Sequence, residues 1–190
     1  MEINFKYIAY FADIIWLFPV FRQRKNKYFL FFLSLSLVNP VAYFTYYFIV
    51  KNMYLPSLTF VYLAFLSFFS KKIIKDKGHY FLLTYIIFLI SYFSTSNWKY
   101  HAVIQSILIF AIILMVAHNF MLSLLEGKFN IFIIVIIAYL FLQIIQGILF
   151  ITMGMELIRN YVYFAHFTEI LLAVFFITFR ADDDRLSIRL

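Results

Sequence analysis

Ionisable and amide side chains interrupt several long apolar stretches of the sequence. Asp13 and Glu169 each lie near the middle of such a stretch, and His166 precedes Glu169 by three residues, so these two share one helix face. A charged group at the centre of a bilayer costs roughly 2.5–3.5 kcal/mol on insertion scales, so it normally faces a bundle interior and has a partner. A neutral carboxyl group there could hold or pass a proton. Residues at similar depth predict a polar cluster near the middle of the membrane: Asp13, Asn39, Gln143, Gln146, His166 and Glu169.

This cluster allows two interpretations. In the first, it lines a polar cavity and handles a proton or a small solute. In the second, its members hydrogen-bond one another between helices, each bond contributing on the order of 0.6 kcal/mol and up to about 2. We favour the second for the amides Asn39, Gln143 and Gln146. We favour the first for Glu169 with His166, because a carboxyl group is costly to keep in lipid.

Other kinds of site find no support in the residue types. The chain has no cysteine, which excludes disulfides, thiolate catalysis and metal sites built on cysteine. His166 precedes Glu169, the reverse of the Glu-x-x-His order of di-iron bundles, and no spacing supports haem ligation by His118 and His166. We therefore expect no catalytic residues, no metal and no cofactor. An intramembrane enzyme acting on lipids is the third alternative.

Seven apolar segments have the length needed to place these groups inside a bilayer. A membrane-spanning helix needs about 20 apolar residues. Of the 190 residues 65% are apolar and 13% charged, and the mean hydropathy is +0.93. Such a chain cannot cover its surface with polar groups, so its outer surface must face lipid. We predict an all-α membrane protein with a single transmembrane domain over residues 1–190 and helices near 5–21, 28–50, 54–70, 79–96, 102–124, 129–151 and 160–179.

Pro40 follows Asn39 inside the second segment. Proline lacks the backbone N–H donor and clashes with the carbonyl group four residues back, here that of Ser36. The sequence therefore predicts a helix kink near mid-membrane, which acts as a fixed bend or as a hinge. Fixed bends are the commoner case, so we favour that role.

The distribution of lysine and arginine predicts the orientation of the chain. Of the 16 basic residues, twelve fall in one set of connecting segments and four in the other. The richer side of a membrane protein is cytoplasmic, so the amino terminus is predicted outside and the carboxy terminus in the cytoplasm. Two basic loops carry most of this charge: Arg22, Arg24, Lys25 and Lys27 in the first, and Lys71, Lys72, Lys75 and Lys77 in the second.

The net charge of +7 is concentrated in these short connections. It therefore favours anchoring to anionic headgroups, at about 1 kcal/mol per basic residue near the surface, over nucleic-acid binding. After the last segment, the run Asp182-Asp183-Asp184 predicts a solvated tail, with partner docking or cation binding as the alternative.

Several features resemble a known group of proteins. A short first segment ends in Phe21-Arg22-Gln23-Arg24-Lys25, the stretch from Phe29 to Leu37 follows, and His166 lies in a last segment with little chain after it. The pattern resembles uncharacterised seven-helix integral membrane proteins common in Bacteroidota. The resemblance implies a multi-pass protein of the bacterial cytoplasmic (inner) membrane, and it carries over no functional residues.

Short loops on both faces, without a catalytic constellation, favour an effect exerted through contacts with another protein. We expect a non-enzymatic integral membrane protein, acting as a sensor-like module or as an accessory subunit of a membrane protein complex. Its partners would be the lipid bilayer and another membrane or cytoplasmic protein, and no nucleic acid. The alternative is a small-solute or proton-coupled transporter that uses Glu169 and His166 with Asp13.

Overall fold

The computed structural model describes residues 5–49, 54–94, 98–152 and 155–189, most of which are helical. Within these ranges the chain forms eight α-helices, one short 3₁₀ helix and two short strands. The elements are α1 Phe5–Ile15, α2 Leu17–Arg22, α3 Phe29–Phe48, α4 Tyr54–Leu66, α5 Lys71–Phe93, α6 Trp98–Leu125, β1 Lys128–Asn130, α7 Ile131–Thr152, α8 Met155–Thr178, η1 Asp184–Leu186 and β2 Ser187–Arg189.

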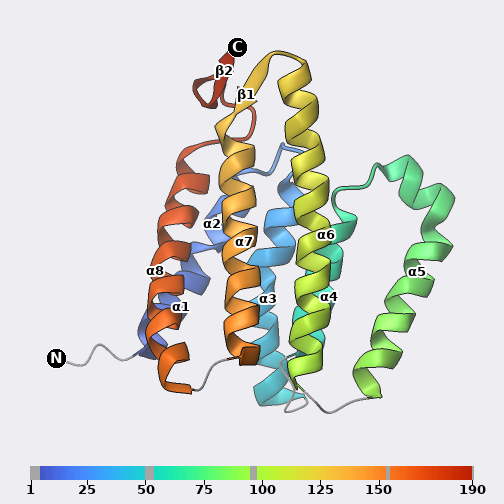
Figure 1. Cartoon of the computed structure of the whole chain (residues 1–190), viewed down its shortest axis with the longest axis vertical. Coiled ribbons are helices and arrows are strands. Elements are labelled where there is room, and N and C mark those ends of the chain that lie inside the picture. Colours follow the sequence, from blue (N-terminus) through green and yellow to red (C-terminus); the bar gives the residue numbers. More distant parts are fainter. Residues whose placement is uncertain (1–4, 50–53, 95–97, 153–154, 190) are drawn as a thin grey trace.

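Most of the helices pack as a bundle, and α5 stands to one side of it (Figure 1). In the bundle α6 packs on α7, α3 on α4, and α8 on both α1 and α2. Three helical stretches are long and apolar enough to cross a membrane, and two more are apolar but shorter. The longer ones are Phe29–Phe48, Lys99–Leu125 and Ile131–Leu149, and the shorter ones are Leu55–Leu66 and Tyr163–Thr178. Seven spans and the orientation of the termini stay predictions.

Aromatic rings fill the centre of the bundle. Phe32 and Phe176 meet edge to face with 4.8 Å between ring centroids, and Phe132 lies 5.3 Å from Phe176. Trp16 joins this group and packs against Tyr139 at 4.7 Å. Tilted and edge-on contacts of this kind add stabilisation beyond the burial of apolar area. The core therefore joins the α1–α2 turn with α3, α7 and α8.

The predicted helix at 5–21 is divided into α1 and α2. Pro19 has no N–H to donate to the carbonyl of Ile15, and its ring clashes with that group, so α1 ends at Ile15. The turn between the helices places Trp16 in the core, where it is 6% exposed. Pro40 lies inside α3, which continues through it as one helix. The kink at Pro40 stays a prediction.

The second predicted basic loop is helical instead. α5 begins at Lys71, before the predicted start at residue 79, and α4 ends at Leu66, before the predicted end at residue 70. Ser70 explains the early start, because its Oγ accepts a hydrogen bond from the N–H of Ile73 over 3.3 Å and serine is a favoured N-cap. Lys77 has non-helical dihedral angles (φ −118°, ψ 15°), so α5 bends between its basic and apolar parts.

The chain after α8 folds back on the end of the bundle. β2 pairs antiparallel with β1, and Leu186 is buried against the core. Asp183 accepts a hydrogen bond from the backbone N–H of Arg185, and the Arg185 guanidinium lies 2.7 Å from its carboxylate. These hydrogen bonds lower the pKa of Asp183 to about 2. The prediction of a solvated acidic tail is therefore wrong for Asp183, because a following arginine and strand order it.

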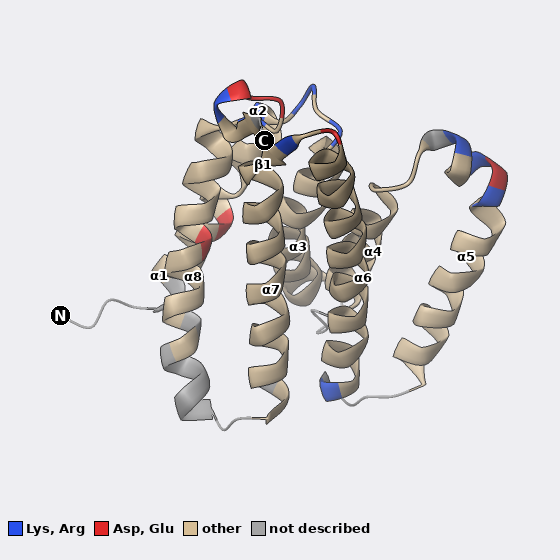
Figure 2. Cartoon of the chain, turned by 45° about the horizontal axis from the view of Figure 1, so that its top comes forward, with Lys and Arg blue, Asp and Glu red and all other residues tan. Residues whose placement is uncertain are grey.

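Basic side chains gather at one end of the molecule. In Figure 2 the blue segments of the α2–α3 connection, of β1 and of the start of α5 lie at the same end, whereas the start of α6, which carries Lys99, lies at the other. The two groups of basic residues that the sequence predicts on one side of a membrane therefore lie at the same end of the molecule, with the start of α5 set apart from the bundle. We call this the basic end of the bundle.

Candidate functional site

Asp13 on α1 and Asn39 on α3 form one half of the predicted cluster. The Nδ2 of Asn39 donates a hydrogen bond to Oδ1 of Asp13 over 2.6 Å. Asp13, in the last turn of α1, is half-buried, whereas Asn39 is exposed although it lies near the middle of α3. The pair is therefore at the surface of the bundle, where α1 approaches α3.

Gln143, His166 and Glu169 form the other half. The Nε2 of Gln143 on α7 donates to Oε1 of Glu169 on α8 over 2.9 Å. The Nδ1 of His166 lies 2.8 Å from Oε2 of the same carboxyl group, and the side chains of His166 and Glu169 are 13% and 16% exposed. Both oxygens of Glu169 thus have a partner.

The two halves face one another across the contact between α1 and α8. Figure 2 shows the acidic segments of these two helices next to each other part-way along the bundle. Asp13 interacts electrostatically with Glu169 and with His166. Tyr139 on α7, a residue that the sequence analysis missed, interacts electrostatically with both carboxyl groups and is 7% exposed. The structure brings together five of the predicted residues: Asp13, Asn39, Gln143, His166 and Glu169.

Gln146 lies one turn further along α7 than Gln143 and is half-buried. Among the hydrogen bonds of the described residues, none joins Gln146 to the other five members of the cluster. The sequence placed Gln146 with Gln143 because a spacing of three residues gives one helix face. Gln143 lies at the level of Glu169 and bonds to it, whereas Gln146 lies one helical turn further along α7.

A row of tyrosines extends the Asp13–Asn39 pair along the surface. Two tyrosines on α1 precede Asp13 at intervals of three residues, and two on α3 follow Asn39 at intervals of four, so each set lies on one face of its helix. Tyr10 and Tyr43 join the sets edge to face, with 6.0 Å between ring centroids. We call this surface the tyrosine face: Tyr7, Tyr10 and Asp13 on α1, and Asn39, Tyr43 and Tyr47 on α3.

Gln23 is a further polar residue that the sequence analysis missed. It is fully buried, and its Nε2 donates to the carbonyls of Phe176 and Phe179 over 3.0 and 2.8 Å. Its Oε1 accepts from the N–H of Ala181 over 3.3 Å. Gln23 therefore caps the last turn of α8, where carbonyls have no partner within the helix. The one available signal was a neutral glutamine among basic neighbours.

The first basic loop and the start of α5 both lie at the basic end. Arg22 donates to the carbonyl of Thr178 over 3.4 Å, and the ammonium group of Lys27 lies over the Tyr28 ring at 5.1 Å. Lys71 begins α5, and its side chain lies outside the described residues. The remaining basic side chains are exposed: Arg24, Lys25, Lys72, Lys75 and Lys77.

In comparisons with known proteins, no family model, no curated protein and no solved structure matches the chain. The resemblance to the seven-helix group of Bacteroidota therefore stays a prediction. Across the described residues, no three side chains of the His, Asp and Glu types form a group that could hold a metal ion.

Proposed function

We propose that the protein is a non-enzymatic membrane protein, a sensor-like module or an accessory subunit, and that its tyrosine face binds another membrane protein. The observation that supports this most is the Asp13–Asn39 hydrogen bond at the surface of the bundle. Asn39 is exposed at a position well inside a helix that is long enough to span a bilayer.

Contact with lipid is unfavourable for the Asp13–Asn39 pair. The hydrocarbon region offers no hydrogen-bonding groups, so the polar atoms that the pair leaves unbonded would lack partners there. A helix of another protein that presents small or polar side chains would supply them. Exposed tyrosines favour the same conclusion, because tyrosine is enriched at protein interfaces and combines an apolar ring with a hydroxyl group.

Site-directed photocrosslinking tests this function. A photoreactive amino acid replaces Tyr7 or Tyr47 on the tyrosine face, which are 70% and 68% exposed. In matched controls it replaces Phe110 or Leu114 of α6, which are 51% and 56% exposed. We expect the first two positions to give one discrete protein adduct in native membranes, and the controls to react with lipid only.

Asn39→Leu in the Tyr47 crosslinking background completes the test. We expect the adduct to disappear, because the polar pair that recognises the partner is gone. The proposed function would be overturned if the α6 positions crosslinked to the same protein with equal yield. It would also be overturned if the chain were recovered in mild detergent as a lone monomer with full activity.

Proton-coupled transport of a small solute is the second candidate. The observation that favours it is the approach of Asp13 to the hydrogen-bonded pair of His166 and Glu169. Under this function Glu169→Gln abolishes pH-dependent uptake, since an amide cannot carry the proton. Uptake into vesicles that is unchanged in this variant would reject transport while leaving the partner-binding function intact.

The proposed topology has seven spans, an outer amino terminus and a cytoplasmic carboxy terminus in a bacterial inner membrane. The common location of the basic residues supports it. The natural chain contains no cysteine, so single cysteines report their side of the membrane without interference. We expect Lys25→Cys and Lys72→Cys to react with a membrane-impermeant maleimide only after the cells are opened. Labelling of intact cells would contradict this orientation.

A further inference from the structure

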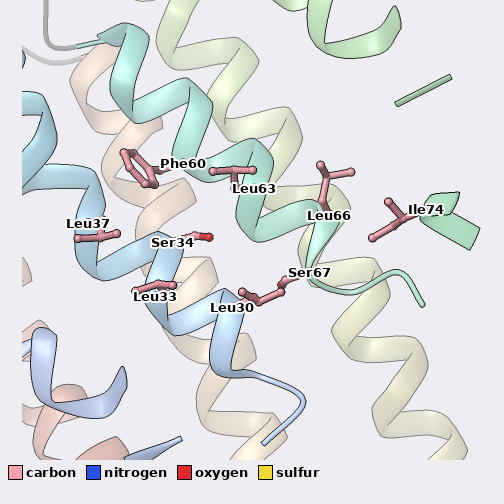
Figure 3. A pocket seen from close by; sticks show the side chains of 9 residues that line it. All are labelled: Leu30, Leu33, Ser34, Leu37, Phe60, Leu63, Leu66, Ser67 and Ile74. Atoms are coloured by element: carbon pink, nitrogen blue, oxygen red, sulfur yellow. The ribbon is translucent and has the colours of Figure 1, made fainter. Parts of the chain in front are cut away.

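An apolar groove of about 220 Å³ lies between α3, α4 and the start of α5. Figure 3 shows side chains from the facing helices α3 and α4 around it, with Ile74 of α5 beside one end. Its walls are formed mainly by Leu33 and Leu37 of α3 and by Phe60 and Leu63 of α4, and Leu30 lies at the same end as Ile74. The lining is thus almost wholly apolar.

The groove begins at the basic end and runs along α3. From Leu30 to Leu37 the helix rises by about 10 Å, at 1.5 Å per residue. One leaflet of the hydrocarbon core is about 15 Å deep, half of the total thickness. The groove therefore extends through about two thirds of the leaflet nearest the basic end, in the direction of a lipid chain.

Lysines lie close in the chain to the residues at this end of the groove. Lys72 lies two residues before Ile74 and Lys75 one residue after it on the first turns of α5, and Lys27 precedes Leu30 by three residues. These lysines are exposed. An apolar groove with lysines near one end suits a molecule that has an apolar chain and an anionic headgroup.

We propose that the groove holds one acyl chain of an anionic phospholipid, with the headgroup against Lys72, Lys75 and Lys27. The bend at Lys77 sets the basic turns of α5 at an angle to its apolar part, and Ser70 caps the first of these turns, four residues before Ile74. This inference rests on placement of the chain in a membrane and is independent of the tyrosine face.

Photoreactive lipids in nanodiscs test the proposal. The purified full chain is placed in a phosphatidylcholine bilayer that contains a trace of phosphatidylglycerol or of phosphatidylcholine, each with the same diazirine-bearing acyl chain. We expect phosphatidylglycerol adducts to concentrate in residues 30–37 and 60–67. Each lysine that contacts the headgroup should raise their yield over phosphatidylcholine by roughly fivefold, as attraction of about 1 kcal/mol per lysine implies.

Two kinds of variant separate the parts of the site. Lys72→Gln with Lys75→Gln should lower the phosphatidylglycerol yield by about 25-fold and leave only the roughly fivefold preference due to Lys27. Lys128→Gln, also at the basic end, should leave the yield unchanged. Leu63→Trp fills the groove and should lower both yields, whereas Leu114→Trp on the exposed face of α6 should lower neither. Leu30→Trp serves as a second filling variant if Leu63→Trp loses its helical circular dichroism.

Adducts spread evenly over α3, α6 and α7, without preference for phosphatidylglycerol, would overturn the proposal. So would filled-groove variants with unchanged yields, or a groove that crosslinks to another protein in native membranes. Release of the chain from membranes without detergent would instead show that membrane placement itself is wrong.

Discussion

Two polar arrangements in this bundle use amide side chains in opposite ways. At the basic end, Gln23 is fully buried, and its amide bonds only to backbone groups of the last helix and the residues that follow it. Part-way along the bundle, Asn39 is exposed and bonds to the side chain of Asp13. Both residues are single amides beside apolar helices. Gln23 caps the end of α8, whereas Asn39 forms part of an exposed polar surface.

The bonding partners of a polar side chain distinguish a structural role from a functional one. A side chain that satisfies backbone carbonyls inside the core stabilises the fold, because each carbonyl would otherwise be buried without a partner. A pair of side chains that bond to each other at the surface contributes little to the fold. The presence of such a pair on a helix that could span a membrane is therefore the basis for the proposed contact with another protein.

The largest expected effect comes from Gln23→Leu. The substitution leaves the carbonyls of Phe176 and Phe179 and the N–H of Ala181 without their partner, so we expect the free energy of unfolding to fall by roughly 3 kcal/mol. The measurement is an equilibrium unfolding titration with sodium dodecyl sulfate in mild detergent.

Gln146→Leu is the matched control for Gln23→Leu. Gln146 has no hydrogen bond to the polar cluster in the described part of the chain, so we expect its replacement to change the unfolding free energy by less than about 1 kcal/mol. If both variants lost the same unfolding free energy, Gln23 would be no more important to the fold than the other amides.

An intermediate effect is expected for the bond between Gln143 and Glu169. A double-mutant cycle with Gln143→Leu and Glu169→Leu should give a coupling energy near 0.6 kcal/mol and below about 1.7, the range for hydrogen bonds between membrane helices. The same titration measures it. A coupling as large as the whole effect of Gln23→Leu would place Glu169 among the structural groups.

A smaller effect on stability is expected for Asn39→Leu. An exposed side chain with one partner should change the unfolding free energy by less than about 0.5 kcal/mol. Loss of the Tyr47 crosslink in the same variant would then report binding alone. A large destabilisation would show that the pair belongs to the fold and would remove the main argument for a partner.

The smallest effect is expected at the ion pair of Asp183 with the exposed Arg185. The pKa of Asp183 is lowered from 3.8 to about 2, so its contribution to stability is complete above pH 3.8 and is lost as the pH falls through 2. Unfolding titrations should therefore show a slight additional loss of unfolding free energy in the natural chain as the pH falls from 3.8 to about 2. Asp183→Asn should remove that component, and an unchanged slope in the variant would exclude the pair as its source.

Long apolar segments were sufficient to predict the main helices. Predicted spans at 28–50, 102–124 and 129–151 correspond to α3, α6 and α7, because apolar length alone defines such helices. The sequence did not give the early start of α5, since lysines look like a loop in a hydropathy pattern although they are good helix formers. It also did not give the break at Pro19, which a smooth apolar segment concealed.

The site was predictable only where its contacts are local. His166 and Glu169 meet because three residues on a helix bring side chains together. Asp13 meets Asn39, and Gln143 meets Glu169, only through the packing of separate helices, which residue types at similar depth suggested but did not pair. Gln23 was beyond reach, since its partners lie near the other end of the chain.

The separation of Gln23 from its partners also sets an order in time. Phe176 follows Gln23 by 153 positions, and at about 5–20 residues per second a ribosome needs roughly 8 to 30 seconds to reach it. Throughout that interval the Gln23 amide has no backbone partner on α8 and remains hydrated. Synthesis of the end of α8 is then the step that allows Gln23 to join α2 to α8, so nascent chains that stop before Phe176 should be cleaved more readily by proteases near Gln23.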